Sequence, residues 1–205
     1  EKNMRWCDPK LSFSRAVRWL VALWGEQVVP ARISEVVAGC STYLQRTTAV
    51  SAESRRRLDG APVGFHDLAS ADDLLDLLAA GRIVLSSAER RKAVVEQAEK
   101  LAASVGGVID VEDNVALVDE ITNLVEEPVG VLGSFDERYL ELPDRILVSV
   151  MGKHQRYLPV RDAEGGLLQY FVTMANGVCD ETVVAAGNES VLRARYEDAL
   201  FFWNQ

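Results

Sequence analysis

The chain has 205 residues, of which 48% are apolar and 26% are charged, and this ordinary globular composition is sufficient to form a sizeable core. No apolar run is long enough to cross a bilayer, so we expect no membrane partner. Three scattered cysteines without CxxC spacing predict neither a disulfide framework nor a metal site, so we expect the reducing cytoplasm as the location.

The net charge of −9 is unevenly distributed along the chain. Residues 1–57 carry a net charge of +5, residues 58–150 a net charge of −12, and residues 151–205 a net charge of −2. A nucleic acid would be repelled by the middle of the chain and tolerated at its two ends. Alternatively, the acidic middle consists of ordinary solvated helix faces.

The first clear secondary-structure signal in the sequence is an apolar, aromatic-rich run. "AVRWLVALWG" (16–25) is followed by "QVVPARI" (27–33), and this arrangement predicts a β-hairpin that turns at Gly25. A buried helix over residues 14–24 is the alternative, because periodicity does not separate the two in a fully apolar run. Residues 47–68 predict a long irregular connection.

Helical patterns follow. Two capping pairs, which begin at Ser70 and Ser86, predict the starts of two helices. Gly106 and its neighbouring glycine end the second of them, and a further amphipathic helix is expected over residues 112–126.

Strand patterns return after Pro128. "VGVLGSF" (129–135) predicts a strand, and residues 156–160 and 167–174 predict a hairpin around two glycines. Between the first strand and the hairpin, Pro143 suits the first turn of a helix. The last helix is expected to begin near Asn188, a good N-cap, and no glycine or proline ends it. We therefore expect that helix to be truncated and the chain to be a piece of a longer protein.

Several enzyme signatures are missing from the sequence. It contains no GxxxxGK[ST], no GxGxxG after a strand, no HExxH and no GxSxG. Its paired carboxylates, such as Asp72 and Asp73, are expected on solvated helix faces. The sequence therefore predicts no catalytic residue and no cofactor in this chain.

The segment "MGKHQRYLPV" (151–160) is the most unusual polar stretch. It places His154, Arg156 and Tyr157 where a helical pattern changes to a strand pattern. Functional roles for the histidine are a general base, a phosphate contact or an RNA base-stacking group. The structural alternative, which we favour, is a helix C-cap that hydrogen-bonds local carbonyl groups. No serine or cysteine nucleophile has a defined relation to His154, which argues against a catalytic role.

Arginines alternate with aromatic residues near the N-terminus. Arg5, Arg15 and Arg18 have this setting, and Arg193 lies on the last helix. Such arginines hold phosphates beside bases that stack on the aromatic rings, but they also form ordinary cation–π and ion-pair contacts.

Four segments resemble the beta subunit of bacterial glycyl-tRNA synthetase. They are "MRW…FSRAVRWLVALWGEQVVP", "EEPVGVLGSFDERYLELP", "MGKHQRYLPVRDAEGGLLQYFVTMANG" and "GNESVLRARYEDALFFWNQ". Their order and spacing match the family, and together they span almost the whole chain.

The resemblance implies a fold and a set of partners. In this family the alpha subunit carries the aminoacylation site for ATP, Mg²⁺ and glycine, and the beta subunit holds the tRNA. The implied partners are glycine tRNA, the alpha subunit and the remaining beta-subunit domains. The region is similar to the B3/B4 domain of the phenylalanyl-tRNA synthetase beta subunit. That similarity implies one α+β domain over residues 1–205, with a largely antiparallel central sheet flanked by helices and a helical insertion at about 70–126.

One stretch departs from the family pattern. After the hairpin the family shows a basic stretch of the form T-x-R-G-H-R-F, whereas this chain has "CSTYLQRTT" at residues 40–48. Any contribution of that histidine and its arginines to tRNA contact is weakened or lost here.

These observations lead to one surface hypothesis and its competitor. The hypothesis is a polar face for tRNA or for neighbouring domains, made of Arg5, Arg15, Arg18, His154, Arg156, Tyr157, Asn176 and Arg193. The competitor is a buried polar network that fixes the junction between sheet and helix.

Three functions remain open for the chain. The first is a non-catalytic tRNA-binding or architectural module that supports glycylation of tRNA by the alpha subunit. The second is a hydrolytic editing domain that deacylates mischarged tRNA, which is an inference from fold similarity alone. The third is a structural spacer between domains.

Overall fold

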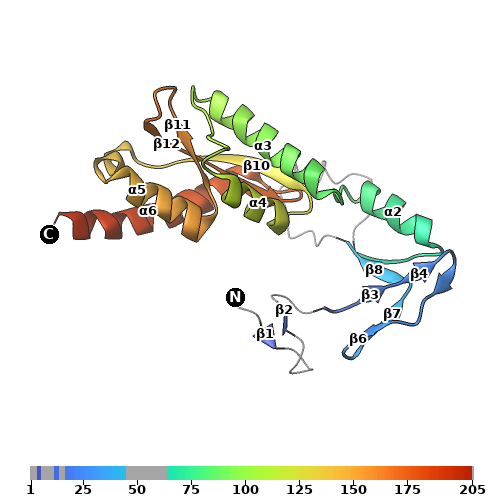
Figure 1. Cartoon of the computed structure of the whole chain (residues 1–205). Coiled ribbons are helices and arrows are strands. Elements are labelled where there is room, and N and C mark those ends of the chain that lie inside the picture. The colour runs from blue at the N-terminus through green and yellow to red at the C-terminus, as the bar shows by residue number, and fades with distance from the viewer. Residues whose placement is uncertain (1–3, 6–11, 14–16, 45–63, 205) are drawn as a thin grey trace. The chain divides into compact units, whose positions relative to one another are not determined.

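The computed structural model describes residues 4–5, 12–13, 17–44 and 64–204 (Figure 1). Contacts divide the chain into two compact units, which we describe separately. Unit 1 comprises residues 1–48 and 60–83, and unit 2 comprises residues 49–59 and 84–205. The fold is α+β, as expected, whereas the similarity to a B3/B4 domain and the single-domain division with a helical insertion stay predictions.

The described part of unit 1 consists of short strands and one helix. Its strands are β1 (Met4–Arg5), β2 (Ser12–Phe13), β3 (Leu20–Val21), β4 (Leu23–Trp24), β5 (Gln27–Val28), β6 (Arg32–Ile33), β7 (Val36–Gly39), β8 (Ser41–Tyr43) and β9 (Phe65–Asp67). Antiparallel β4 and β5 form the predicted hairpin, and Gly25 at its turn has the positive φ of 57° that glycine tolerates best. The alternative of a buried helix is wrong for residues 17–24.

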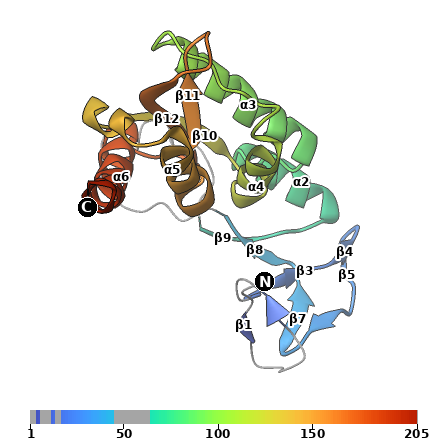
Figure 2. The same ribbon diagram turned by 60° about the vertical axis from the view of Figure 1, so that its left-hand side comes forward.

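Four further strand pairings are described in unit 1, and the first of them joins antiparallel β1 and β2. β7 lies between β3, which is parallel to it, and β6, which is antiparallel (Figure 1). β8 pairs with β9 (Figure 2). β9 falls in the stretch that was expected to be irregular, and residues 47–63 of that stretch lie outside the described residues. The predicted helix after Ser70 is α2 (Ala71–Ala80), and Ser70 and Asp73 form a complete capping box.

Unit 2 is built on one antiparallel sheet. The strand order is β10 (Pro128–Ser134), β12 (Leu167–Asn176) and β11 (Leu158–Arg161), so β12 is central. The predicted hairpin is confirmed, with Gly165 at a φ of 88° in its turn. The predicted antiparallel sheet is confirmed as well.

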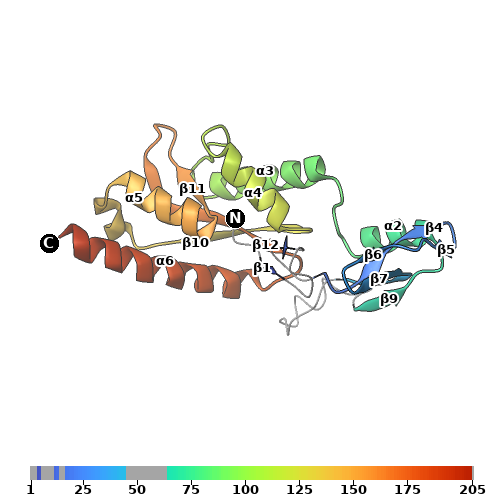
Figure 3. The same ribbon diagram turned by 60° about the horizontal axis from the view of Figure 1, so that its bottom comes forward.

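Helices cover both faces of this sheet (Figure 3). α3 (Ser87–Ala103) and α4 (Val115–Leu124) pack on one face, and α6 (Glu181–Trp203) packs on the other. A 3₁₀ turn η1 (Glu137–Glu141), α5 (Asp144–Ser149) and a π-helical turn η2 (Val150–Gln155) join α6 in the second layer.

The central strand supplies both hydrophobic cores. Val172 packs with Val94 and Val118 from α3 and α4, whereas Phe171 packs with Leu192 and its neighbours in the α6 layer. Successive side chains of a strand point to opposite faces, which is why one apolar strand holds two helical layers.

One helix boundary was predicted wrongly. α6 begins after Asp180, whose Oδ1 accepts hydrogen bonds from the N–H groups of Thr182 and Val183, so Gly187 and Asn188 lie inside the helix. The sequence suggested Asn188 as the N-cap because asparagine is a common N-cap residue. In the structure its side chain instead accepts a tertiary hydrogen bond from Tyr157. Within the residues that the structure describes, no helix is both long and apolar enough to span a membrane.

Candidate functional site

The segment 151–160 forms an uncommon junction between helix and strand. Arg156 has left-handed backbone angles of φ 59° and ψ 41° directly after the π-helical turn η2. The N–H groups of Tyr157 and Arg156 donate to the carbonyl oxygens of Met151 (3.0 Å) and Gly152 (3.3 Å). The Tyr157 bond spans six residues and the Arg156 bond spans four. The corresponding bonds at a typical glycine-capped helix end span five and three residues. Since a left-handed non-glycine residue costs roughly 1–2 kcal/mol, neighbouring contacts must hold this turn in place.

The Arg156 side chain supplies part of that support. Its Nε donates to Glu120 Oε1 on α4 at 2.9 Å, and its Nη1 donates to the backbone oxygens of Lys153 and His154 at 3.3 Å. The guanidinium therefore satisfies the last carbonyls of η2 and ties η2 to α4. It is committed to intramolecular contacts, as the competing hypothesis of a polar network expects.

Tyr157 supplies the second anchor of the junction. Its side chain is buried, stacks on Phe171 at 4.6 Å and donates a hydrogen bond to Asn188 Oδ1 at 2.5 Å. Burial raises the pKa of the Tyr157 hydroxyl, an effect that the charge of Arg195 partly opposes. This tyrosine fixes the start of β11 to α6 and is not available at the surface.

Asn176 also makes structural contacts. Its Oδ1 accepts hydrogen bonds from the N–H groups of Glu126 (2.8 Å) and Glu127 (3.0 Å). This side chain joins the end of β12 to the segment that leads from α4 into β10.

The remaining candidates lie at the surface or outside the described part of the chain. His154 is exposed beside Lys153, and Arg18 is exposed in unit 1. Arg15 and the side chain of Arg5 lie outside the described residues.

Arg193 lies on a different flank of α6 from the junction. Asn188 on this helix faces η2, whereas Glu189 accepts hydrogen bonds from Ser134 and Glu197 pairs with Arg138. Arg193 is four residues from both glutamates and therefore shares their flank. The structure brings His154, Arg156 and Tyr157 together but places Arg193 away from them.

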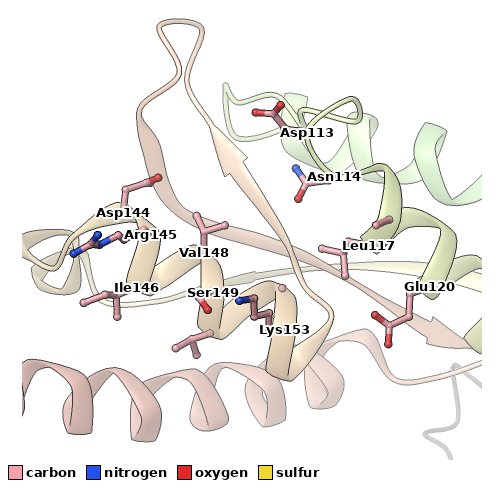
Figure 4. Close-up of a pocket in the computed structure, with 13 residues that line it drawn as sticks. Asp113, Asn114, Leu117, Glu120, Asp144, Arg145, Ile146, Val148, Ser149 and Lys153 are labelled. Atoms are coloured by element: carbon pink, nitrogen blue, oxygen red, sulfur yellow. The ribbon is translucent and has the colours of Figure 1, made fainter. Parts of the chain in front are cut away.

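A groove of about 950 Å³ opens next to the junction, between α4 on one side and α5 with η2 on the other (Figure 4). Its apolar lining includes Leu117, Ile146, Val148 and Val150. Its polar lining consists of Asp113, Asn114, Glu120, Asp144, Arg145, Ser149 and Lys153. Sequence analysis missed this groove because it depends on the tertiary pairing of α4 with α5, and only the basic character of residues 153–156 hinted at it.

The charges around the groove are not balanced. Two of its three carboxylates are paired, since Asp144 binds Arg161 (3.0 and 3.2 Å) and Glu120 binds Arg156. The third, Asp113, makes no ion pair within the described residues. Arg145 and Lys153 are exposed and also make no ion pair there, so two unpaired cations share the groove with one unpaired carboxylate. Arg145 lies at the side of the groove away from α4 (Figure 4).

Chemically, this arrangement suits an anion that carries an apolar or planar part. The aliphatic lining accepts the flat or apolar portion, and the two unpaired cations suit a phosphate or carboxylate. No group of three histidine, cysteine or acidic side chains within the described residues is placed to hold a metal ion.

Comparison with known proteins gives the family. The family model described as "Glycyl-tRNA synthetase beta subunit" matches residues 1–205. The chain is 38% identical over 205 residues to the glycine–tRNA ligase beta subunit of Desulforamulus reducens, covering all of this chain and 27% of that protein. It is 40% identical over 203 residues to the chloroplastic/mitochondrial glycine–tRNA ligase 2 of Arabidopsis thaliana, covering 98% of this chain and 17% of that protein.

The fold and groove define an α+β protein with a partly apolar surface groove that carries two cations unpaired within the described part of the chain, and the comparisons define the family. This chain belongs to the glycyl-tRNA synthetase beta-subunit family. It spans 27% of the length of its relative from Desulforamulus reducens, so it corresponds to one part of such a subunit.

Proposed function

We propose that this chain is a non-catalytic part of a glycine–tRNA ligase beta subunit and that it holds tRNA during glycylation. Its partners are then glycine tRNA, the alpha subunit and the remaining beta-subunit domains. ATP and Mg²⁺ belong to the alpha subunit in this proposal. Membership of the family over residues 1–205 supports the general role in tRNA glycylation.

The main observation that supports the tRNA-holding role is that two cations at the groove have no ion-pair partner among the residues that the structure describes. Arg145 and Lys153 line this partly apolar groove, and exposed His154 follows Lys153 in the chain. Phosphate contacts from such side chains position RNA, and apolar surface accepts a base or ribose. Lys153 and His154 belong to residues 151–205, whose net charge is −2, whereas Arg145 and most of the groove lining belong to the acidic middle of the chain.

An architectural role is the second candidate. Two contacts support this role: the Arg156–Glu120 pair ties η2 to α4, and the Tyr157–Asn188 hydrogen bond ties the start of β11 to α6. If all of its polar residues serve this purpose, their loss lowers stability without affecting tRNA.

Steady-state kinetics of the assembled enzyme separate the two roles. In the full-length beta subunit assembled with the alpha subunit, the double substitution Arg145→Ala/Lys153→Ala should raise the KM for tRNA at least about 10-fold, because one charge-assisted hydrogen bond is worth about 1.5 kcal/mol or more. The KM for glycine and for ATP should not change. The matched control is Lys100→Ala, which removes an exposed cation at the end of α3 and away from the groove.

The same preparations also test editing. We expect no deacylation of mischarged tRNA above the rate in buffer, since the proposal assigns no catalytic group to the groove. An unchanged KM for tRNA in the double variant would favour the architectural role, and a deacylation rate that the variant abolishes would favour editing.

A further inference from the structure

Unit 1 carries a second groove, which the tRNA-holding proposal does not use. It has a volume of about 360 Å³ and lies over β3, β7, β8 and β9. The residues that matter for its chemistry are Arg18, Trp19, Val37, Gly39, Ser41 and Phe65.

Exposed aromatic side chains form the walls of this groove. Trp19 is 37% exposed and Phe65 is 61% exposed. Trp19 is nevertheless held in position, because its ring lies 5.7 Å from that of Tyr43, which pairs directly with Phe65 across β8 and β9. A large aromatic ring that is held in position yet exposed to solvent is a common feature of binding surfaces.

The uncompensated charge at this groove is positive. Arg18 is exposed and makes no ion pair or hydrogen bond within the described residues. The acidic side chain at the groove, Glu35, already pairs with Arg32 at 3.6 Å. Ser41 donates its hydroxyl to Asp67 at 2.5 Å, so that hydroxyl proton is engaged as well.

The floor of the groove is open. A Cβ atom placed on Gly39 would meet no other atom within 4 Å, and this glycine does not have a positive φ. A larger side chain at this position can therefore enter the groove without a clash or backbone strain.

We propose that unit 1 binds an unpaired nucleotide of RNA in this groove, with the base against Trp19 and Phe65 and the phosphate on Arg18. A guanidinium beside exposed aromatic rings is the usual combination for single-stranded nucleic acid, because every base has a face that stacks and every nucleotide has a phosphate. A duplex does not fit, since its base faces are covered by their neighbours in the stack. The inference rests on the proposed function only in that the RNA is taken to be tRNA. It concerns a groove in unit 1 rather than the groove in unit 2, and different variants test it.

Fluorescence anisotropy with the assembled enzyme tests this proposal. The probe is a dye-labelled, mixed-sequence single-stranded hexaribonucleotide, and the comparison is the same strand annealed to its complement. We expect the single strand to bind at least about 10-fold more tightly than the duplex, and Trp19→Ala/Phe65→Ala to weaken it at least about 10-fold. Arg18→Ala should weaken binding and reduce the log–log slope of affinity against salt concentration by about 1, the value for one phosphate contact.

Two further variants keep the test independent of folding. Gly39→Leu fills the groove while leaving both aromatic rings in place, and it should weaken hexamer binding as much as the double variant does. Trp24→Ala removes a tryptophan of unit 1 that is 81% exposed but does not line the groove, and it should leave binding unchanged.

Equal affinity for single strand and duplex, or unchanged affinity in Gly39→Leu, would overturn the proposal. So would a loss of subunit assembly at unchanged hexamer affinity, because the groove would then be a protein contact. Failure of the tRNA-holding function is recognised separately, by an unchanged KM for tRNA in Arg145→Ala/Lys153→Ala.

Discussion

Arg156 Nε lies 2.9 Å from Glu120 Oε1, and this pair joins the π-helical turn η2 to α4 beside the larger groove. The arginine that forms it also has left-handed backbone angles, so one residue combines a strained backbone with a tertiary contact. Two substitutions at this position separate these two properties.

Arg156→Ala loses the ion pair and both contacts to the carbonyls of η2 while keeping a Cβ in the left-handed region. Arg156→Gly loses the same contacts but removes the backbone strain. We expect Arg156→Ala to lower the free energy of unfolding by about 1–2 kcal/mol and Arg156→Gly to be more stable than Arg156→Ala by about 1 kcal/mol. Urea unfolding measures both values.

A control for this prediction is Arg91→Ala, which breaks the exposed Arg91–Asp119 pair (3.0 Å) at an ordinary helical position. Its effect should stay within about 0.5 kcal/mol. If Arg156→Ala and Arg156→Gly have the same stability, the left-handed backbone of residue 156 is not a source of strain.

Gly133 and Phe171 form a second pair that substitution can test. They are direct partners across β10 and β12, and a Cβ on Gly133 would lie 2.2 Å from Cζ of the Phe171 ring. Gly133→Ala should therefore displace a buried ring and lower the free energy of unfolding by about 1–3 kcal/mol. Thermal and urea unfolding give the value.

Gly187→Ala is the matched control for this change. Gly187 lies inside α6, and a Cβ there would meet no other atom within 4 Å. The same substitution should therefore stabilise the protein by about 0.5–1 kcal/mol, since alanine is a better helix former than glycine. A stabilising Gly133→Ala would show that the Phe171 ring does not lie over residue 133.

Tyr196 predicts a fall in stability at alkaline pH. Its hydroxyl is buried, donates to the carbonyl oxygen of Leu147 at 3.2 Å, and has a pKa raised above its ordinary value by burial. Because the folded-state pKa is higher than the unfolded value of about 10, the stabilisation is complete below pH 10 and is lost as the pH rises above it. The loss should reach at most about 1.4 kcal/mol per pH unit for this group.

Tyr196→Phe tests that prediction. It should be less stable than the parent by about 1 kcal/mol at pH 8, because the hydrogen bond is lost, but its stability should fall less steeply between pH 9 and pH 11. Urea unfolding across this pH range gives both slopes. Identical slopes would mean that another group causes the alkaline loss.

Asn176 tests whether the tRNA and structural roles separate by residue. Asn176→Ala removes the acceptor of two backbone N–H groups and should lower the free energy of unfolding by about 1–2 kcal/mol. At a temperature where the variant is fully folded, its KM for tRNA should equal that of the parent. A raised KM for tRNA with unchanged stability would instead indicate that Asn176 contacts RNA.

Local sequence signals predicted the local parts of this fold. The capping pair at Ser70 and the glycine of the Gly25 turn act through neighbouring residues, so their patterns are readable without a structure. The start of α6 was misjudged because Asn188 resembles a cap but bonds to Tyr157, which is 31 residues away. The π-helical turn was not predicted, since it depends on Glu120 from another helix.

The candidate site was only partly readable for the same reason. Sequence analysis found the polar junction at His154 and Arg156, but whether an arginine faces solvent or an internal carboxylate depends on packing. It gave no sign that Arg193 lies on the other flank of α6 from the junction, because tertiary packing decides which flank of that helix meets η2. It also missed Arg145, which only tertiary structure places on the same groove as Lys153.

The salt dependence of tRNA binding tests the central claim most directly. The affinity of the assembled enzyme for glycine tRNA should be measured at several salt concentrations, for the parent, for Arg145→Ala/Lys153→Ala and for the control Lys100→Ala. If the two groove cations contact phosphates, the double variant should bind more weakly at low salt, and its log–log slope should be smaller than the parent's by about 1–2. Identical slopes and affinities in all three proteins would contradict tRNA contact at this groove.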